Sequence, residues 1–459
     1  MIEPLLNCFR IPELRKKILF TVFMLSIFRI GAFIPVPGVD SQVVGQAAGQ
    51  LGGGALGLVD MFSGGALSKC AVFGLGIMPY ISASIVFQLL ATVIKPLEEL
   101  QKEGEAGQKK INQYTRYATV LLCFVQGFFM ARMVKGIEVS DGVFVVPTGV
   151  REGFSFELIC IISLTAGTLF VMWLGEQIQE HGIGNGISLL IMGGIVARIP
   201  PTIVQLFNTQ VDGNLFNPAA DKIGILGIAG MIIMYVLVVV GVVLLNQGQR
   251  RIAVQTAKQI KGRRVFGGQR YYLPLKVGAA GVIPIIFAQS LLMFPQMLFR
   301  KLAGGTGGGW SDMWQWFASL FDYTSNAYLF IYVTLIVFFA FFWTAVQFNP
   351  IKMAEDMKEH GNFIPGIRPG QRTSEYFERV MTRITLAGAG FIAVIAILPY
   401  IIQRSNPGLG KAAYIYGGTG ILIVVGVALD LVQKIENHLL MRHYDGFLKG
   451  GSRIRGRQS

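Results

Sequence analysis

Long runs of apolar residues, separated by polar or glycine-rich connections, recur along the whole chain. A helix needs roughly 20 mostly apolar residues to cross the hydrocarbon core of a bilayer, and the runs are close to that length. The pattern therefore predicts an all-α membrane protein with ten transmembrane helices, at about residues 18–36, 75–94, 115–134, 153–174, 184–204, 223–246, 272–299, 326–347, 378–403 and 415–436.

Two of these runs are broken by glycine and proline in a similar way. The second contains Gly76-Ile77-Met78-Pro79-Tyr80-Ile81, and the seventh contains Gly281-Val282-Ile283-Pro284-Ile285-Ile286. Broken helices at corresponding places in two halves are typical of the working sites of membrane transport proteins. We therefore expect two five-helix halves, residues 18–204 and 205–436, with the functional axis between the second and seventh helices.

Composition agrees with a membrane protein. Hydrophobic residues make up 53% of the chain and charged residues 14%, which is too apolar for a soluble domain and leaves no separate soluble domain in the sequence. Of the 40 lysines and arginines, 29 fall in the tails and in alternate connections. The positive-inside rule assigns that set to the cytoplasm. A cytoplasmic N-tail (1–17) and a cytoplasmic C-tail (437–459) follow.

The start of the chain has no pattern of a removable leader. The first apolar run follows Arg15-Lys16-Lys17, is long enough to stay in the membrane, and has no small-residue cleavage site. A transit-type N-terminus is not evident either. These features favour a bacterial inner (plasma) membrane over a thylakoid.

Two connections on the basic side, residues 247–271 and 348–377, are longer than neighbouring helices need. Their charge is explained by topology and contact with anionic lipids. Long loops are also commonly functional, and a partner with an acidic surface, such as ribosomal RNA, would suit them. The sequence favours partner binding and leaves both interpretations open.

Catalytic and ion-coupling chemistry has little support within the apolar runs. Acidic residues such as Asp60 lie in loops or at the ends of runs, and Glu157 is ambiguous. Arg29 is the one clear intramembrane charge; we expect it to bond backbone carbonyls or to reach the outer interface. Four cysteines and four histidines show no metal-binding spacing. We expect no catalytic residue, metal or cofactor, and hence a passive path through the membrane.

Residues 51–74 precede the second apolar run and are rich in glycine. They are too interrupted to cross a bilayer. Such a segment is either a re-entrant half-helix buried in protein or an ordinary external loop made permissive by glycine.

Several motifs in order resemble the SecY family, the channel subunits of bacterial protein-conducting translocons. The resemblance covers about residues 13–435 and rests on segments spread along the chain: 29–38, 61–68, 76–85, 173–177, 182–188, 248–251, 348–350 and 365–370. It implies a clamshell of two five-helix halves that passes unfolded preproteins across the membrane and releases hydrophobic segments sideways into it.

The resemblance also implies particular sites. A constriction of apolar side chains acts as a gasket that excludes water and ions. A re-entrant plug near residues 58–74 closes the outer side, with Gly64-Gly65 and the Gly74/Gly76 pair as hinges. By motif, the pore ring consists of Ile81, Ile85, Ile191, Ile195, Ile286 and Ile423, and the plug core consists of Ser63, Gly64, Gly65, Ala66, Leu67 and Ser68.

The implied lateral gate lies between helices two and three and helices seven and eight, with Gln126, Ser290 and Phe294 beside Ile85. Interhelical bonds of this kind contribute only about 1 kcal/mol, so they break readily, but they also fasten helices that never part. A hydrophobic signal sequence is expected to bind there.

The implied docking residues for the SecA ATPase or the ribosome are Arg250, Arg251 and Arg368. Asn246-Gln247 stands where the family pattern has an acidic and a basic residue, which affects the finer contacts of that loop. Further implied partners are the SecE and SecG subunits, preprotein signal sequences and membrane lipids. The chain has no GxxxxGK[ST] motif, so energy for transport must come from a partner.

Two other classes of protein remain. A secondary transporter of small solutes would need polar or charged groups near Pro79 and Pro284, and those neighbourhoods are nearly all apolar. A membrane-embedded enzyme would need a nucleophile with its base, or a metal cluster, in the apolar part.

Overall fold

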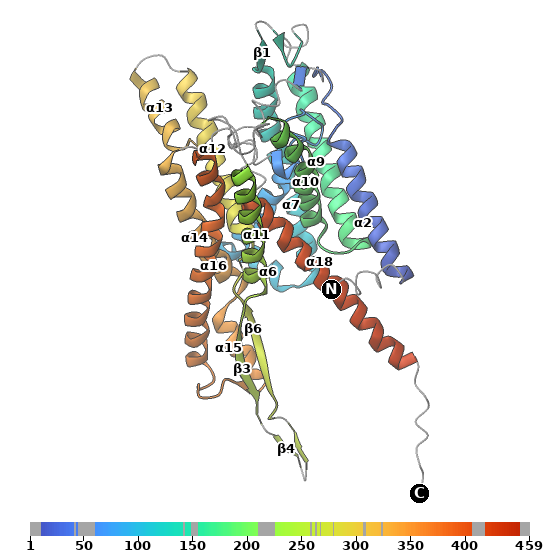
Figure 1. Ribbon diagram of the computed structural model, residues 1–459. Coiled ribbons are helices and arrows are strands. Elements are labelled where there is room, and N and C mark those ends of the chain that lie inside the picture. The colour runs from blue at the N-terminus through green and yellow to red at the C-terminus, as the bar shows by residue number, and fades with distance from the viewer. Residues whose placement is uncertain are drawn as a thin grey trace. The chain divides into compact units, whose positions relative to one another are not determined.

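The computed structural model describes residues 11–40, 43–44, 60–140, 143–147, 155–209, 225–257, 259–261, 264–266, 268–278, 280–305, 309–322, 325–405 and 418–449 (Figure 1). Residues 1–10 of the predicted N-tail and 450–459 of the predicted C-tail lie outside these ranges. The chain divides into two compact units: residues 1–200 with 427–459, and residues 201–426.

Each predicted transmembrane range is occupied by a helix in the described part of the chain. In the first half these are α2 (Pro12–Gly31), α5 (Met78–Val93), α7 (Glu105–Lys135), α9 (Ser155–His181) and α10 (Gly186–Thr209). In the second half they are α11 (Ile225–Gln247), α12 (Ile283–Gly305), α14 (Asn326–Gln347), α16 (Gln371–Ser405) and α18 (Gly418–Lys449). By length and composition alone, six described helices could span a membrane, or seven if α5 is joined to the short helix α6 (Lys95–Lys102).

In the first unit, α7 packs against α5 and α9, and α2 packs against α9. Small residues allow the close approaches. A Cβ atom on Gly186 of α10 would lie only 1.8 Å from the carbonyl oxygen of Gly175 on α9, so glycine is needed where these two helices meet. Membrane helices associate through such small residues because lipid provides no hydrophobic force between them.

The first predicted helix ends earlier than expected, at Gly31 rather than near residue 36. Pro35 and Pro37 lack the backbone N–H that a helix interior needs. The chain instead becomes extended: the Val36 N–H donates to the Cys70 carbonyl (2.9 Å), and the Val72 N–H donates to the Ile34 carbonyl (2.8 Å). This pairing ties residues 60–77, here called the turn segment, to the end of α2.

Within the turn segment, residues 60–62 are helical and residues 63–77 follow as consecutive turns, apart from the bridge at Ala71. The short strands β1 (Glu138–Ser140) and β2 (Val143–Phe144) pair after α7. Val145, which follows β2, is fully buried and accepts a backbone hydrogen bond from Asp40 (3.1 Å). The connections that follow α2 and α7 therefore pack around the turn segment.

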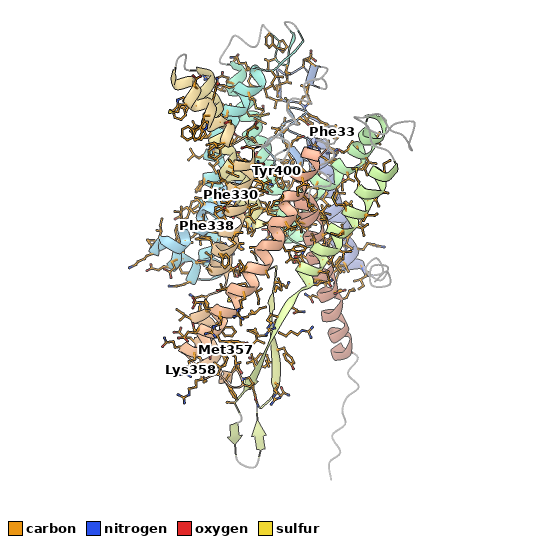
Figure 2. The ribbon with its side chains drawn as sticks, turned by 60° about the vertical axis from the view of Figure 1, so that its left-hand side comes forward. Phe33, Phe330, Phe338, Met357, Lys358 and Tyr400 are labelled. Atoms are coloured by element: carbon orange, nitrogen blue, oxygen red, sulfur yellow. The ribbon has the colours of Figure 1, made fainter. Side chains whose placement is uncertain are left out.

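In the second unit, α14 packs against α12 and α16, and α13 (Gly309–Leu320) packs against α12. Phe330 and Phe338, labelled on α14 in Figure 2, are 73% and 58% exposed. Such exposed aromatic side chains on an apolar helix suit a lipid environment.

The seventh predicted helix also differs at its start, since residues 272–276 belong to a strand and α12 begins at Ile283. Gly281 adopts φ +60°, a conformation that ends regular structure and that glycine adopts without strain. The strand is β6 (Arg270–Lys276), which pairs with β3 (Gln249–Thr256); β3 pairs in turn with β7 (Asn362–Phe363). A small hairpin, β4 (Gln259–Lys261) with β5 (Arg264–Phe266), lies beyond β3.

Candidate functional site

The turn segment is held in the first unit by a buried ion pair. Asp60 is fully buried, and its Oδ2 lies 2.5 Å from Nη1 of Arg198 on α10. Its Oδ1 accepts the backbone N–H of Ser68 at 2.8 Å. Both carboxylate oxygens are thus bonded. The sequence analysis placed Asp60 among the carboxylates of the loops and did not predict this ion pair.

Arg29 of α2 provides a second polar contact to the turn segment. Its Nη1 donates to the carbonyl oxygen of Gly64 at 2.6 Å, which confirms the prediction that Arg29 bonds a backbone carbonyl. Its guanidinium also lies 4.8 Å from the ring centre of Phe33, and the Lys69 ammonium lies 3.3 Å from the same ring. Both are cation–π contacts.

Two glycines allow the turn segment to rest directly on α10. Gly64 adopts φ +69°, and a Cβ there would lie 3.0 Å from the Gly194 Cα. A Cβ on Gly194 would lie 3.0 Å from the Phe62 carbonyl oxygen and 3.1 Å from the Gly64 nitrogen. The neighbours on both sides are backbone atoms, so a side chain at either position would force the two segments apart.

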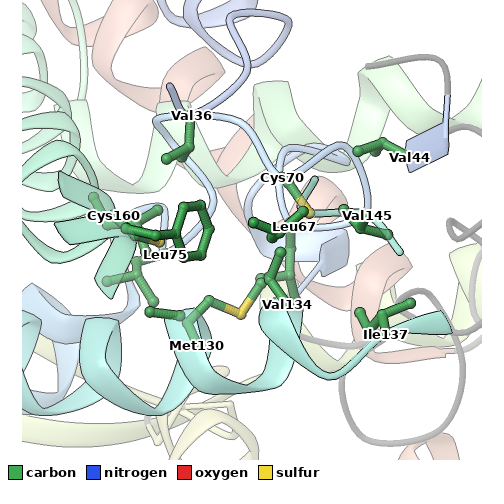
Figure 3. Close-up of a cluster of buried hydrophobic side chains, with 14 residues drawn as sticks. Val36, Val44, Leu67, Cys70, Leu75, Met130, Val134, Ile137, Val145 and Cys160 are labelled. Atoms are coloured by element: carbon green, nitrogen blue, oxygen red, sulfur yellow. The ribbon is translucent and has the colours of Figure 1, made fainter. Parts of the chain in front are cut away.

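The far side of the turn segment is apolar. Leu67, Cys70 and Leu75 are buried in one cluster (Figure 3) with residues of α7 and α9 and of the outer connections: Val36, Val44, Met130, Ala131, Val134, Ile137, Val145, Val146, Phe156, Cys160 and Leu164. At about 25 cal/mol per Å² of apolar surface, burial of this kind is the main attraction that holds the segment in place.

The face of α10 that supports the turn segment also carries two predicted ring residues. Ile191, Gly194, Ile195 and Arg198 are spaced three or four residues apart and therefore share one face of the helix. Ile191 and Ile195 are 6% and 4% exposed. The structure thus joins the predicted plug to two ring positions on one helix face.

The other predicted ring residues are divided between the units. Ile81 is half-buried and Ile85 is buried on α5, in the first unit. Ile286 on α12 and Ile423 on α18 are buried and belong to the second unit. Neither unit by itself brings all six isoleucines together.

The predicted gate residues are likewise divided. Gln126 is half-buried on α7; Ser290 and Phe294 lie on α12, and their side chains are outside the described part of the chain. The adjacent Gln289 donates to the hydroxyl of Tyr332 on α14 at 2.9 Å. Sequence reasoning missed this bond between α12 and α14.

The two long basic connections form one folded body in the second unit. The three-stranded sheet takes β3 and β6 from residues 249–276 and β7 from the connection that follows α14. One face packs on α15 (Pro350–Glu359) and the start of α16, through a core of Ile252, Leu275, Ile364, Phe377 and Met381. Met357, labelled in Figure 2, joins this core from α15.

The predicted docking arginines are exposed on this body. Arg250 and Arg251 lie at the start of β3, and Arg368 lies in the turn between β7 and α16. The strand register sets Arg251 opposite Pro274 and Gln255 opposite Arg270, so the solvent face of the sheet also carries Arg270, Tyr272 and Lys276, all exposed. Exposed and buried positions alternate in β3, as they do in a half-buried strand. Sequence reasoning treated these residues as a loop and did not recognise the strand.

No group of three potential metal ligands occurs in the described ranges. Cys70, Cys123 and Cys160 are buried free thiols, and buried thiols without an electropositive neighbourhood are generally unreactive.

Long apolar helices in each of the two units, an irregular segment buried within the first unit, and an exposed basic sheet in the second together define a multi-pass α-helical membrane protein. The SecY family model matches residues 71–432, and the chain belongs to the SecY family. This confirms the resemblance found in the sequence.

The relatives match over nearly their whole length. The protein translocase subunit SecY of Escherichia coli K12 is 42% identical over 440 residues, covering 95% of this chain and 94% of the relative. The SecY of Thermus thermophilus is 41% identical over 457 residues, covering 100% of each chain.

Solved structures share the fold at lower identity. A protein-conducting channel has a TM-score of 0.58 at 19% identity, with 92% of each chain covered. Sec61 in the canine ribosome–channel complex has a TM-score of 0.56 at 17% identity, also with 92% of each chain covered. The predicted all-α membrane fold is thereby confirmed.

Proposed function

We propose that this chain is the channel subunit of a protein translocase. It passes unfolded preproteins across the membrane and is not itself a catalytic enzyme. The observation that carries the proposal is the seating of the turn segment on the α10 face that bears Ile191 and Ile195. A gated channel needs a plug that is seated beside the pore ring and can leave it. The relatives are named as translocase subunits.

In this proposal the plug is the segment near residues 58–74, with residues 63–68 as its core; residues 60–74 of it belong to the turn segment, and residues 58–59 lie outside the described part of the chain. Ile81, Ile85, Ile191, Ile195, Ile286 and Ile423 form the ring around the moving polypeptide. Isoleucine suits a gasket because its branched side chain is stiff at the first torsion and offers no hydrogen bond to the passing chain. A narrow apolar ring also resists the passage of water and ions.

Hydrophobic segments leave sideways between the two halves, beside Gln126, Ser290 and Phe294. A signal sequence binds there because it exchanges water for lipid and apolar protein surface. The hydrogen bond from Gln289 to Tyr332 keeps α12 and α14 together as this edge moves.

The sheet of β3, β6 and β7 is the docking body for the ribosome or the SecA ATPase, through Arg250, Arg251 and Arg368. Arg251, Arg270 and Tyr272 are exposed on one sheet face, and Arg250 and Arg368 are exposed beside it; this set suits an RNA or acidic protein surface. The canine relative of similar fold is found in a ribosome–channel complex. The remaining proposed partners are SecE, SecG, signal sequences and lipids, with both termini cytoplasmic in a bacterial inner membrane.

The test is transport into vesicles that contain the chain with SecE and SecG, after addition of SecA, ATP and a preprotein. We expect the preprotein to become protected from external protease only when ATP is present. Vesicles with the same lipids but without the chain are the control. Absence of protection, combined with uptake of a small solute, would overturn the proposal in favour of a secondary transporter.

A further inference from the structure

A cluster of aromatic rings lies where α12 meets α13 in the second unit. Only residues 306–308 separate these helices, which pack side by side (Figure 1). The ring centre of Phe299 on α12 lies 5.8 Å from that of Trp314 and 5.5 Å from that of Phe317, both on α13. The ring of Phe321, just after α13, lies 5.4 Å from Phe299. These are the separations of attractive aromatic pairs, so Phe299 holds α13 against α12.

The depth of this cluster in a bilayer follows from α14, which is one of the described helices that could span a membrane. Its 22 residues are about 33 Å long and match a hydrocarbon core of about 30 Å, so the bilayer centre lies near Ile336. The helix runs antiparallel to α12, because Gln289 bonds to Tyr332 whereas Phe287 stacks on Phe339. The bilayer centre therefore crosses α12 near Phe287.

Phe299 lies about 12 residues beyond that level, which is about 18 Å along the axis of α12. The hydrocarbon core ends about 15 Å from the bilayer centre, and the headgroups reach about 20–22 Å. The aromatic cluster thus lies at the level of the headgroups. It is on the side of the membrane opposite the three-stranded sheet, since β6 precedes the start of α12 and β7 follows the end of α14.

Some apolar side chains at this level are exposed. Trp316, beside the cluster, is 59% exposed, and its ring meets that of Phe317 edge to face at 5.1 Å. Met313 lies three residues before Trp316, on the same face of α13, and is exposed as well. On α12, Leu298 is also exposed. An apolar surface therefore continues past the hydrocarbon edge into the headgroup level.

A different face of α13 is polar. Asp312, Gln315 and Ser319 are exposed and are spaced three or four residues apart, so they form a strip on the side of the helix away from Phe299. A carboxylate is costly in the hydrocarbon, whereas the large exposed ring of Trp316 is unfavourable in water. The boundary between headgroups and acyl chains suits both, and tryptophan is enriched there in membrane proteins.

We propose that the face of α13 formed by Met313 and Trp316 binds phospholipids at the boundary between headgroups and acyl chains, in the leaflet opposite the sheet. The indole N–H donates to ester or phosphate oxygens of the lipid, and its ring covers the first methylene groups. This contact holds the end of α12 at a fixed depth, and with it Ile286, which is next to the level of the bilayer centre. The inference does not depend on the proposed function, because it requires only that α14 crosses a bilayer.

Quenching of tryptophan fluorescence by labelled lipids measures the depth of the indole. Four of the five tryptophans are replaced by phenylalanine, which retains an aromatic ring at each position: Trp173, Trp310, Trp314 and Trp343. The protein is reconstituted into phosphatidylcholine vesicles that carry a nitroxide either on the headgroup or on the lower part of an acyl chain. We expect the headgroup label to quench Trp316 roughly twofold more than the acyl-chain label, or better.

A matched protein retains Trp343 as its single tryptophan instead. Trp343 is on α14, about 10 Å along the helix from its middle, and should be quenched more by the acyl-chain label than by the headgroup label. The reversed order tests the helix register on which the inference depends. If both proteins show the same order of quenching, the assigned depth of the Trp316 face is wrong.

Iodide added to the water distinguishes the alternatives. If iodide quenches Trp316 strongly and neither lipid label does, α13 projects into water. If neither iodide nor the labels quench it, protein covers this face. Either result would overturn the inference. If the single-tryptophan protein does not fold, the parent is compared with Trp316→Phe: a smaller quenched fraction with the headgroup label in Trp316→Phe supports the lipid contact, and an unchanged fraction contradicts it.

Discussion

At the residue scale, the fit between the turn segment and α10 depends on positions where a single atom matters. Gly194 and the neighbouring Gly193 differ sharply in this respect. A Cβ on Gly194 would meet backbone atoms at 3.0 and 3.1 Å, whereas one on Gly193 would meet only the flexible end of Leu25 at 3.2 Å. Two adjacent glycines therefore have different tolerances for substitution.

We expect Gly194→Val to unseat the turn segment and raise the resting ion conductance of the reconstituted channel. Overpacking costs about 1–3 kcal/mol, which shifts the seated-to-released ratio about 5- to 160-fold. Conductance across planar bilayers measures the effect. Gly193→Ala is the control and should conduct like the parent; equal conductance of Gly194→Val and the parent would contradict the proposed seat.

Part of this site could be predicted from the identity of its residues alone. The glycines at 64 and 65 marked a segment with unusual turns, and Arg29 stood out as a charge within an apolar run. Asp60 did not stand out, because a carboxylate in a glycine-rich stretch resembles any loop acid. Its partner Arg198 is 138 residues away, and no local pattern links two such positions.

At the element scale, charge joins the ends of α7 and α9. Glu157, in the first turn of α9, is 6% exposed and lies 3.8 Å from Arg132 and 3.6 Å from Lys135 in the last turn of α7. An acid at a helix start and bases at a helix end also complement the two helix dipoles. The sequence left Glu157 ambiguous, and the structure gives it an anchoring role beside the turn segment.

Glu157→Gln should lower the thermal stability of the purified protein, because two cations lose their counter-charge. The loss should be about 1 kcal/mol, since Arg132 is half-exposed and solvent screens the interaction. Thermal unfolding in detergent measures it. Glu180→Gln is the matched control, since its exposed side chain lies 4.0 Å from His181; an equal loss in both variants would argue against the anchor.

The three-stranded sheet takes residues that hydropathy assigns to the seventh helix. Hydropathy predicts that residues 272–276 belong to a transmembrane helix, because Tyr272, Leu273 and Leu275 extend the apolar run. Their burial instead alternates along the strand, and β3 provides a partner strand. Pairing with β3 makes these residues a strand. Hydrophobicity alone cannot distinguish a half-buried strand from the start of a helix.

Two substitutions in this body should separate folding from docking. Arg368→Glu should block SecA-driven transport and leave the protein folded, because the side chain is exposed and its backbone carbonyl still accepts from Thr373 at 2.9 Å. Phe377→Ala should destabilise the body by about 3–5 kcal/mol, since Phe377 is fully buried. Limited proteolysis measures whether the body is folded: we expect Arg368→Glu to resist the protease and Phe377→Ala to be cleaved. If Arg368→Glu resists the protease and transports normally, Arg368 has no docking role.

At the scale of the whole molecule, hydropathy placed a helix in each of the ten predicted ranges, although the first helix ends early, at Gly31, and the seventh begins late, at Ile283. The family followed from motifs spread along the chain. The pore ring remains a prediction because its six members are divided between two units. Apolar residues are common in every spanning helix, so an isoleucine in the ring and one facing lipid look alike in sequence. Only the motif resemblance selected these six.

Replacing Ile191 and Ile195 together with glycine should make the closed channel leak ions, because the gasket loses two of its stiff side chains. Resting conductance should rise several-fold. Ile233→Gly on α11, where the side chain is 66% exposed, controls for the cost of about 1 kcal/mol that glycine imposes on a helix. A leak of the same size in both variants would count against the ring.

The way the sheet is connected to the helices has a mechanical consequence. Only Gly248 separates α11 from β3, its N–H bonds to Leu244 at 2.8 Å, and its carbonyl accepts the N–H of Val277 just after β6. A Cβ on Gly388 of α16 would lie 2.6 Å from the Val277 carbonyl oxygen, so α16 presses on the same junction. In the proposed function, a force that SecA applies to the sheet is therefore transmitted directly to α11 and α16, because no flexible linker lies between these helices and the strands.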